Sequence, residues 1–249
     1  MTDIRDTIYA DPLSATGLFS FDHSVARVFP DMIKRSVPGY ATIISMTGLL
    51  AGRYASAGSK LFDLGCSLGA SSLAMRQNIR EPGCEIVAVD NSSAMLERCR
   101  ELFNSDVVEH PEHGSTPVSL VCADLQDTSI EDASVVVLNF TLQFIPREIR
   151  DEVIERIYRG LRPGGIMVLS EKVTFEDPHL DELNIDLHHQ FKRANGYSDL
   201  EIAQKRSALE NVLLPETLAR HRQRITGAGF SSCDVWFQCF NFASLIALK

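Results

Sequence analysis

Short apolar segments alternate with helical patterns along the chain after Gly58, and this alternation limits the fold more than any other feature. The apolar segments are rich in β-branched residues and are bounded by glycine or polar residues, as expected of buried strands. We expect strands at residues 60–64, 84–90, 118–122, 134–140 and 166–170. We expect helices between them at 70–79, 93–103 and 147–160. A strand–helix–strand rhythm predicts an α/β fold with a parallel sheet and helices on both faces.

The segments before and after this alternation show different patterns of apolar residues. Residues 1–58 are expected as a helical N-terminal cap, with helices at 21–36 and 40–54 and with Pro30 dividing the first one. Residues 172–215 are expected as a polar, largely helical insertion, followed by a helix at 217–226. The last apolar segments, 235–239 and 242–248, are expected to add an antiparallel pair to the sheet. A chain of 249 residues fits one such domain, 1–249.

Composition excludes several classes of function. The cysteines are scattered without a Cys-x-x-Cys pair, which indicates reduced thiols in a cytoplasmic protein and no zinc site. No apolar run approaches the ~18 residues of a membrane span, and the polar, acidic N-terminus is unlike a secretory signal. A formal net charge of −9 disfavours direct binding to nucleic acid, because an acidic surface repels phosphates.

A glycine turn follows the first expected strand, where an open parallel sheet binds its ligands. The turn reads Asp63-Leu64-Gly65-Cys66-Ser67-Leu68-Gly69. Glycine permits positive φ and a close approach of the backbone to a ligand. Ser67 stands where a dinucleotide fingerprint has glycine, so a pyrophosphate fits poorly, whereas Asp63 suits a ligand with an ammonium group. The alternative is a plain strand–helix turn.

Polar residues end the next three expected strands. Asp90 is placed to accept hydrogen bonds from both hydroxyls of a ribose, as in other doubly wound nucleotide sites. Asp124 is placed to accept from an adenine amino group while Leu125 packs on the ring, and Asn139 ends the fourth strand. Alone, Asp124 or Asn139 is more typical of turn chemistry. Together and in order, the four loops favour a ligand site.

The motifs of this strand edge resemble those of the class I S-adenosylmethionine (SAM)-dependent methyltransferases. They are Asp63-x-Gly65-x-Ser67-x-Gly69, Val89-Asp90-Asn91-Ser92, Ala123-Asp124-Leu125 and Leu161-Arg162-Pro163-Gly164-Gly165. Further segments look like the carboxy-S-adenosylmethionine synthases within that superfamily. These segments cover residues 28–33, 35–40, 137–144, 192–198 and 236–242. The resemblance extends over essentially the whole chain. Its main departure is a longer, more polar stretch at 107–116, expected as a loop.

The resemblance implies both a fold and a reaction. The fold is a Rossmann-like, mostly parallel seven-stranded sheet with an antiparallel C-terminal strand. The reaction carboxylates the methyl group of SAM, which serves as substrate, while prephenate loses carbon dioxide and becomes phenylpyruvate. A separate enzyme then uses the carboxylated SAM to modify the wobble uridine of tRNA. The family also suggests a homodimer.

The resemblance further implies which residues bind the cofactor. Tyr40 matches a tyrosine beside the methionine end of SAM, and Arg206 matches the arginine that holds the new carboxylate. The full expected set is Tyr40, Gly65, Cys66, Ser67, Asp90, Asn91, Asp124, Leu125, Asn139 and Arg206. No residue is assigned to remove the methyl proton.

The insertion supplies the cations that a dianionic donor needs in an acidic protein. They are His188, His189, Lys192, Arg193, Lys205 and Arg206. Arginine offers a planar fork for a carboxylate, although charged helix positions are ordinarily a solvated face. His188 and His189 have no third ligand at metal spacing, so no metal is expected.

Two other functions stay open at this stage. The loop after residues 134–140 has no Asn/Asp-Pro-Pro-Tyr clamp, which disfavours methylation of the amino groups of bases or glutamine. A conventional small-molecule methyltransferase remains the main alternative. A non-catalytic scaffold that binds SAM or another metabolite is the third possibility.

Overall fold

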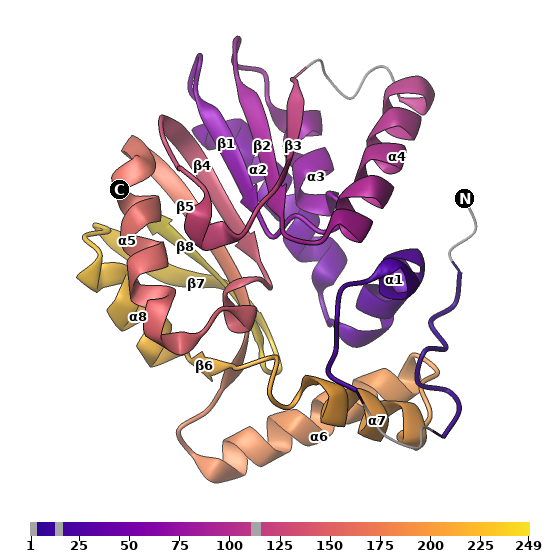
Figure 1. The fold of residues 1–249 in the computed structure, drawn as a ribbon. Coiled ribbons are helices and arrows are strands. Elements are labelled where there is room, and N and C mark those ends of the chain that lie inside the picture. Colours follow the sequence, from indigo (N-terminus) through magenta and orange to yellow (C-terminus); the bar gives the residue numbers. More distant parts are fainter. Residues whose placement is uncertain (1–3, 13–16, 111–115) are drawn as a thin grey trace.

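A mostly parallel sheet forms the centre of the protein. The computed structural model describes residues 4–12, 17–110 and 116–249, and its main sheet has the strand order β3-β2-β1-β4-β5-β8-β7 (Figure 1). The strands are β1 (Lys60–Leu64), β2 (Glu85–Asp90), β3 (Val118–Cys122), β4 (Ala133–Asn139), β5 (Leu161–Thr174), β7 (Ser232–Cys239) and β8 (Phe242–Leu248). Strands β1 to β5 pair in parallel, and β8 runs antiparallel to both β5 and β7. The expected seven-stranded, mostly parallel sheet is therefore confirmed. A short strand, β6 (Glu216–Thr217), pairs with the end of β5.

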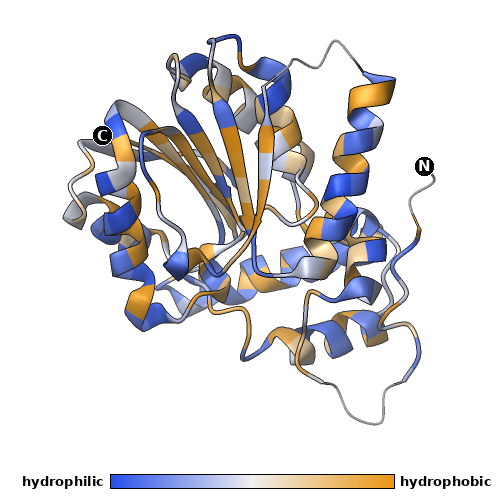
Figure 2. Cartoon of the chain, turned by 45° about the horizontal axis from the view of Figure 1, so that its top comes forward, coloured by the Kyte–Doolittle hydropathy of each residue, from blue (hydrophilic) through white to orange (hydrophobic). Residues whose placement is uncertain are grey.

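Helices cover both faces of this sheet, as Figure 1 shows. Helices α2 (Tyr40–Tyr54), α3 (Ala70–Asn78) and α4 (Ser93–Glu109) lie on one face, and α5 (Arg150–Gly160) and α8 (Leu218–Gly227) lie on the other. Strand β4 is buried on both sides: Val135 and Val137 join the core under α2 and α3, while Val136 and Leu138 join the core under α5 and α8. Figure 2 shows the central strands as the most hydrophobic part of the fold.

The first helix, α1 (His23–Ser36), is continuous through Pro30, so the expectation that this proline divides it was wrong. Proline removes one backbone hydrogen bond from a helix interior. Packing outweighs that loss, because Val25, Val28 and Met32 are buried in one apolar cluster around the proline. The Asp22 carboxylate also caps the helix by accepting from two backbone amides.

The stretch expected as a loop at 107–116 is partly helical. Helix α4 continues to Glu109, beyond the expected end at residue 103. Its first half is fixed by buried residues such as Met95 and Cys99, and the added turns carry the exposed Val107 and Val108. Residues 111–115 of the expected loop lie outside the described residues.

The insertion after β5 forms two helices, α6 (Pro178–Ala194) and α7 (Asp199–Leu209), beyond the carboxyl ends of the strands (Figure 1). It is attached to the N-terminal segment and α1 by polar contacts. Arg35 Nε donates to Asn195 O at 2.7 Å, and the Arg35 guanidinium lies 3.8 Å from the centre of the Tyr197 ring. Tyr197 in turn donates to the Asp6 carboxylate at 2.5 Å. The helical insertion is confirmed, and α1 fixes its position.

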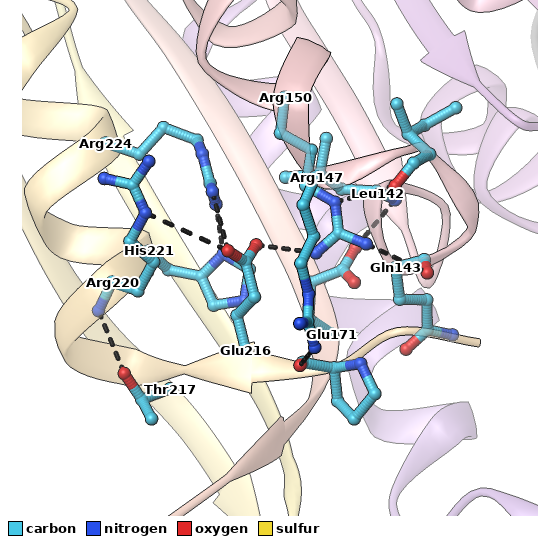
Figure 3. A network of polar contacts seen from close by, with 12 residues as sticks. Leu142, Gln143, Arg147, Arg150, Glu171, Glu216, Thr217, Arg220, His221 and Arg224 are labelled. Atoms are coloured by element: carbon cyan, nitrogen blue, oxygen red, sulfur yellow. Dashed lines mark hydrogen bonds and ion pairs between the residues drawn. The ribbon is translucent and has the colours of Figure 1, made fainter. Parts of the chain in front are cut away.

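A buried ion-pair network joins the loop after β4 to β6 and α8 (Figure 3). Arg150 is completely buried, and it donates to Glu216 Oε2 at 2.6 Å and to the carbonyls of Gln143 and Ile145 at 3.2 and 2.8 Å. Arg224 donates to the other oxygen of Glu216 at 2.9 Å. Because a buried charge is costly without such partners, the network fixes the course of this loop.

We expect Arg150→Met to lower the free energy of unfolding by about 3–5 kcal/mol, because it leaves Glu216 and two carbonyls without their main buried donor. Arg222→Met is the matched control, since Arg222 is 49% exposed where it pairs with Asp234. Its effect should stay below about 1 kcal/mol. Urea unfolding followed by circular dichroism measures both. Equal, small effects would show that the buried network contributes no more than a surface pair.

Candidate functional site

The glycine turn after β1 is folded tightly against its neighbours. Gly65 and Ser67 both have positive φ, at 78° and 50°. The amides of Gly65 and Cys66 donate to Val89 O at 2.8 and 2.9 Å. A Cβ atom at Gly65 would lie 2.4 Å from the side chain of Thr141, in the loop after β4. Glycine is therefore required at this position by both its φ and the approach of the next loop.

Asp63 is a buried carboxylate at the end of β1. It is 1% exposed and accepts a hydrogen bond from Ser72 Oγ at 2.6 Å. Burial, together with the neighbouring Asp90, raises its pKa to about 6. Within the described residues it has no cationic partner, so the amino group of a ligand would supply one.

Asp90, at the end of β2, holds the glycine turn to the start of α4. Its Oδ2 accepts from Ser67 N at 2.8 Å, and its Oδ1 accepts from Ser92 N at 2.9 Å. Burial raises the pKa of this carboxyl as well. A carboxylate has about four acceptor positions, so two amide bonds leave capacity for ribose hydroxyls.

The next two expected loops also lie beside this turn. Asn91 Nδ2 donates to Asp124 Oδ1 at 2.9 Å, which joins the ends of β2 and β3. Leu125 is buried at the start of a short 3₁₀ helix, η1 (Leu125–Asp127). Asn139, at the end of β4, donates to Ser71 Oγ at 3.4 Å, while its own Oδ1 is buried without a partner in the described chain. That free acceptor is suited to a ligand donor.

Tyr40 is the first residue of α2 and lies near Asp63, beside the loops that follow β1 and β4. Its ring centre is 6.4 Å from that of Phe140, which follows β4. Burial raises the pKa of the Tyr40 hydroxyl, and the Asp63 carboxylate raises it further. The structure therefore brings Tyr40 close to the buried acid.

Arg206 is the one expected site residue that lies apart from the strand ends. Its exposed side chain on α7 makes no hydrogen bond or ion pair with any residue that the structure describes. Its charge lowers the pKa of Lys172 and of His189, so it belongs to the cations of the insertion. The other nine expected residues, Tyr40, Gly65, Cys66, Ser67, Asp90, Asn91, Asp124, Leu125 and Asn139, lie on the β1–β4 loops and the start of α2.

Sequence reasoning missed Lys172 and Phe242. Lys172 follows Glu171 near the end of β5 and pairs in register with Phe242 on β8. Burial and the nearby Arg206 lower the pKa of this lysine. A cation close to the carboxyl end of a buried strand was the available signal, because ligands bind at that end of a parallel sheet.

The described residues contain neither a metal-binding cluster nor a membrane-spanning helix. No group of three or more His, Cys, Asp or Glu side chains in residues 4–12, 17–110 and 116–249 is arranged to hold a metal ion. No helix in the same ranges is both long and apolar enough to cross a membrane. All six cysteines are described and are free.

Comparison with known proteins gives the family context of this geometry. Residues 61–165 match the family described as a methyltransferase domain. The chain is 59% identical over 249 residues to the carboxy-S-adenosyl-L-methionine synthase of Citrifermentans bemidjiense, with all of both chains covered. It is 60% identical, again over both full chains, to the synthase of the same name from Trichlorobacter lovleyi. In structure it is similar to a putative SAM-dependent methyltransferase from Methanococcus maripaludis, with a TM-score of 0.58, 20% identity and coverage of 94% and 96% of the two chains.

We expect the affinity for SAM to fall as the pH drops below about 6, where Asp63 becomes protonated. A ligand ammonium binds the ionised carboxylate, so binding weakens by up to about tenfold per pH unit. Titration calorimetry between pH 5 and 8 measures this effect. Asp63→Asn should bind SAM more weakly and lose the dependence, whereas the exposed Asp132→Asn should keep it. Equal SAM affinity of the wild type at pH 5 and pH 8 would contradict a contact with Asp63.

Proposed function

The chain belongs to the carboxy-S-adenosyl-L-methionine synthases, and from this premise we propose that it converts SAM and prephenate into carboxy-SAM and phenylpyruvate. The observation that carries the proposal is that two different sites lie together at the carboxyl ends of the strands. A strand-end site with a buried acid suits the amino acid part of SAM, and cations of the insertion suit a dianionic donor.

The proposed reaction balances without a metal or a redox partner. The ring of prephenate loses its carboxyl group as carbon dioxide and its hydroxyl as water, which leaves phenylpyruvate. The methyl group of SAM loses a proton, and the resulting sulfonium ylide forms a carbon–carbon bond with the carbon dioxide. The hydroxide that leaves the ring and a group derived from the donor are both suitable acceptors for the methyl proton.

The residues divide between the two substrates in this proposal. Tyr40 and Asn139 lie beside the methionine part of SAM, Asp90 binds the ribose, and Asp124 with Leu125 binds the adenine. Arg206 binds the carboxylate that is transferred, because its guanidinium forms paired hydrogen bonds with a carboxylate. Arg206 is suited to this role because no described residue occupies its guanidinium.

The setting of the reaction forms the rest of the proposal. The protein acts in the cytoplasm as a homodimer, and free cysteines suit a reducing compartment. Carboxy-SAM passes to a separate enzyme that modifies the wobble uridine of tRNA. The net charge of −9 disfavours direct contact of this chain with that RNA.

Purified protein incubated with SAM and prephenate should produce phenylpyruvate and a SAM species heavier by one carbon dioxide. Liquid chromatography with mass spectrometry measures both products, and prephenate labelled with ¹³C in the ring carboxyl should transfer its label. S-adenosylhomocysteine and a methylated acceptor without the heavier species would instead support a conventional small-molecule methyltransferase.

We expect Arg206→Ala to weaken binding of carboxy-SAM by roughly ten- to hundredfold, because a charged hydrogen-bond donor is lost. The affinity for SAM should change less than about twofold, since SAM lacks the added carboxylate. Arg193→Ala is the control, because Arg193 is half exposed and already pairs with Asp199 at 2.7 Å. Calorimetry with each ligand measures the difference. Equal losses for the two ligands would exclude this role of Arg206.

A further inference from the structure

The cations around the insertion fall into two groups once their partners are known. Three of them have structural partners. Arg193 pairs with Asp199, His188 Nε2 lies 2.8 Å from Ser36 O, and Lys205 lies 3.5 Å from Ser36 Oγ and 3.9 Å from an oxygen of Asp6. The side chains of the others make no hydrogen bond or ion pair within the described chain: Lys172, His189, Lys192 and Arg206.

Burial separates Lys192 from an ordinary surface lysine. This residue is only 7% exposed, although lysine is almost never buried without a partner. Burial, and then the charges of Lys205 and Lys172, lower its pKa to about 7. Among the described residues, Asp6 is the acid that opposes this effect, and it already accepts from Tyr197. A solvated helix face therefore does not account for Lys192.

Lys172 and His189 belong to the same cluster. The pKa of His189 is lowered by burial and then by the charges of Lys192, Arg206 and Lys172. The pKa of Lys172 is lowered by burial and by Arg206, with Asp181 as the opposing acid. These side chains come from β5, α6 and α7, so the fold brings cations of distant sequence position together. Their mutual repulsion is relieved when an anion binds among them.

A row of aromatic rings connects this cluster to the proposed SAM site. The Phe140 ring lies 6.4 Å from Tyr40 and 5.9 Å from Phe242, between centroids. The Phe242 ring lies 4.8 Å from His188, which directly precedes His189 on α6. Phe242 is also the register partner of Lys172. The row of rings therefore begins at Tyr40, beside the proposed position of the methionine end of SAM, and ends at the cations of the insertion.

We propose that Lys172 and Lys192, with His189 beside them, form a binding site for the second carboxylate of the donor, the one that stays on the product as the pyruvyl carboxylate. This inference rests on the proposed function, and it assigns the two carboxylates of the donor to different cations. Arg206 binds the group that is transferred, and the lysine pair binds the group that is retained. Two separate anion sites orient the donor so that only its ring carboxylate faces the methyl group of SAM.

Phenylpyruvate carries the retained carboxylate but not the transferred one, so it is the probe that separates these sites. We expect Lys172→Met to weaken inhibition by phenylpyruvate, and to raise the KM for prephenate, by roughly ten- to hundredfold. The affinities for SAM and carboxy-SAM should change less than about twofold, which also shows that the variant folds. Lys172→Arg should recover part of the loss. Lys60→Met is the control, because Lys60 is exposed at the amino end of β1, away from the carboxyl ends where both sites lie.

Arg206→Ala should give the reverse pattern, with carboxy-SAM binding weakened and phenylpyruvate inhibition retained. The inference is overturned if phenylpyruvate inhibits Lys172→Met as well as it inhibits the wild type, or if Lys172→Met weakens carboxy-SAM and phenylpyruvate equally. Failure of the proposed function has a different signature, since the wild type would then form no carboxy-SAM from prephenate.

Discussion

The buried pair of Arg150 and Glu216 fixes the part of the structure on which both candidate sites depend. Arg150 holds the carbonyl of Gln143, and the side chain of Gln143 accepts from the amide of Lys172 at 3.0 Å. Glu171 accepts from Leu142 N at 2.9 Å in the same loop, and burial raises its pKa to about 8 despite the nearby arginine. The network thus determines where the loop after β4 meets the glycine turn and where β5 presents Lys172.

Much of the candidate site could be predicted because its residues lie at the carboxyl ends of the parallel strands. Apolar strands that follow one another in βαβ units must run in parallel, so their ends meet. Asp63, Asp90, Asp124 and Asn139 each lie within two residues of the carboxyl end of one of these strands. A one-residue error in register would move such a side chain to the wrong face. The turn around Gly65 could also be predicted, because glycines directly after a strand indicate positive φ and a close approach of the backbone to another group.

What the sequence did not reveal depends on contacts between distant segments. Pro30 predicts a break, yet the apolar cluster around Val28 and Met32 keeps α1 continuous. Arg150 and Glu216 are 66 residues apart, and neither carries a motif. The cations of the insertion look alike in the sequence. Only the fold shows that Arg193 and Lys205 have partners, while Lys192 is buried without one among the described residues.

This division of cations has a consequence for selectivity. In an acidic chain, Lys172, Lys192 and Arg206 have no side-chain partner among the described residues, and gathering such charges around one place costs stability. That cost grows as water is excluded. A donor with two carboxylates relieves that repulsion at two points, whereas a donor with one carboxylate leaves some of the cations unpaired. Unpaired buried charges penalise the wrong ligand more strongly than a hydrophobic pocket does. In the proposed function, the methyltransferase fold would supply the SAM site, and the cations carried by β5, α6 and α7 would supply the preference for a dicarboxylate.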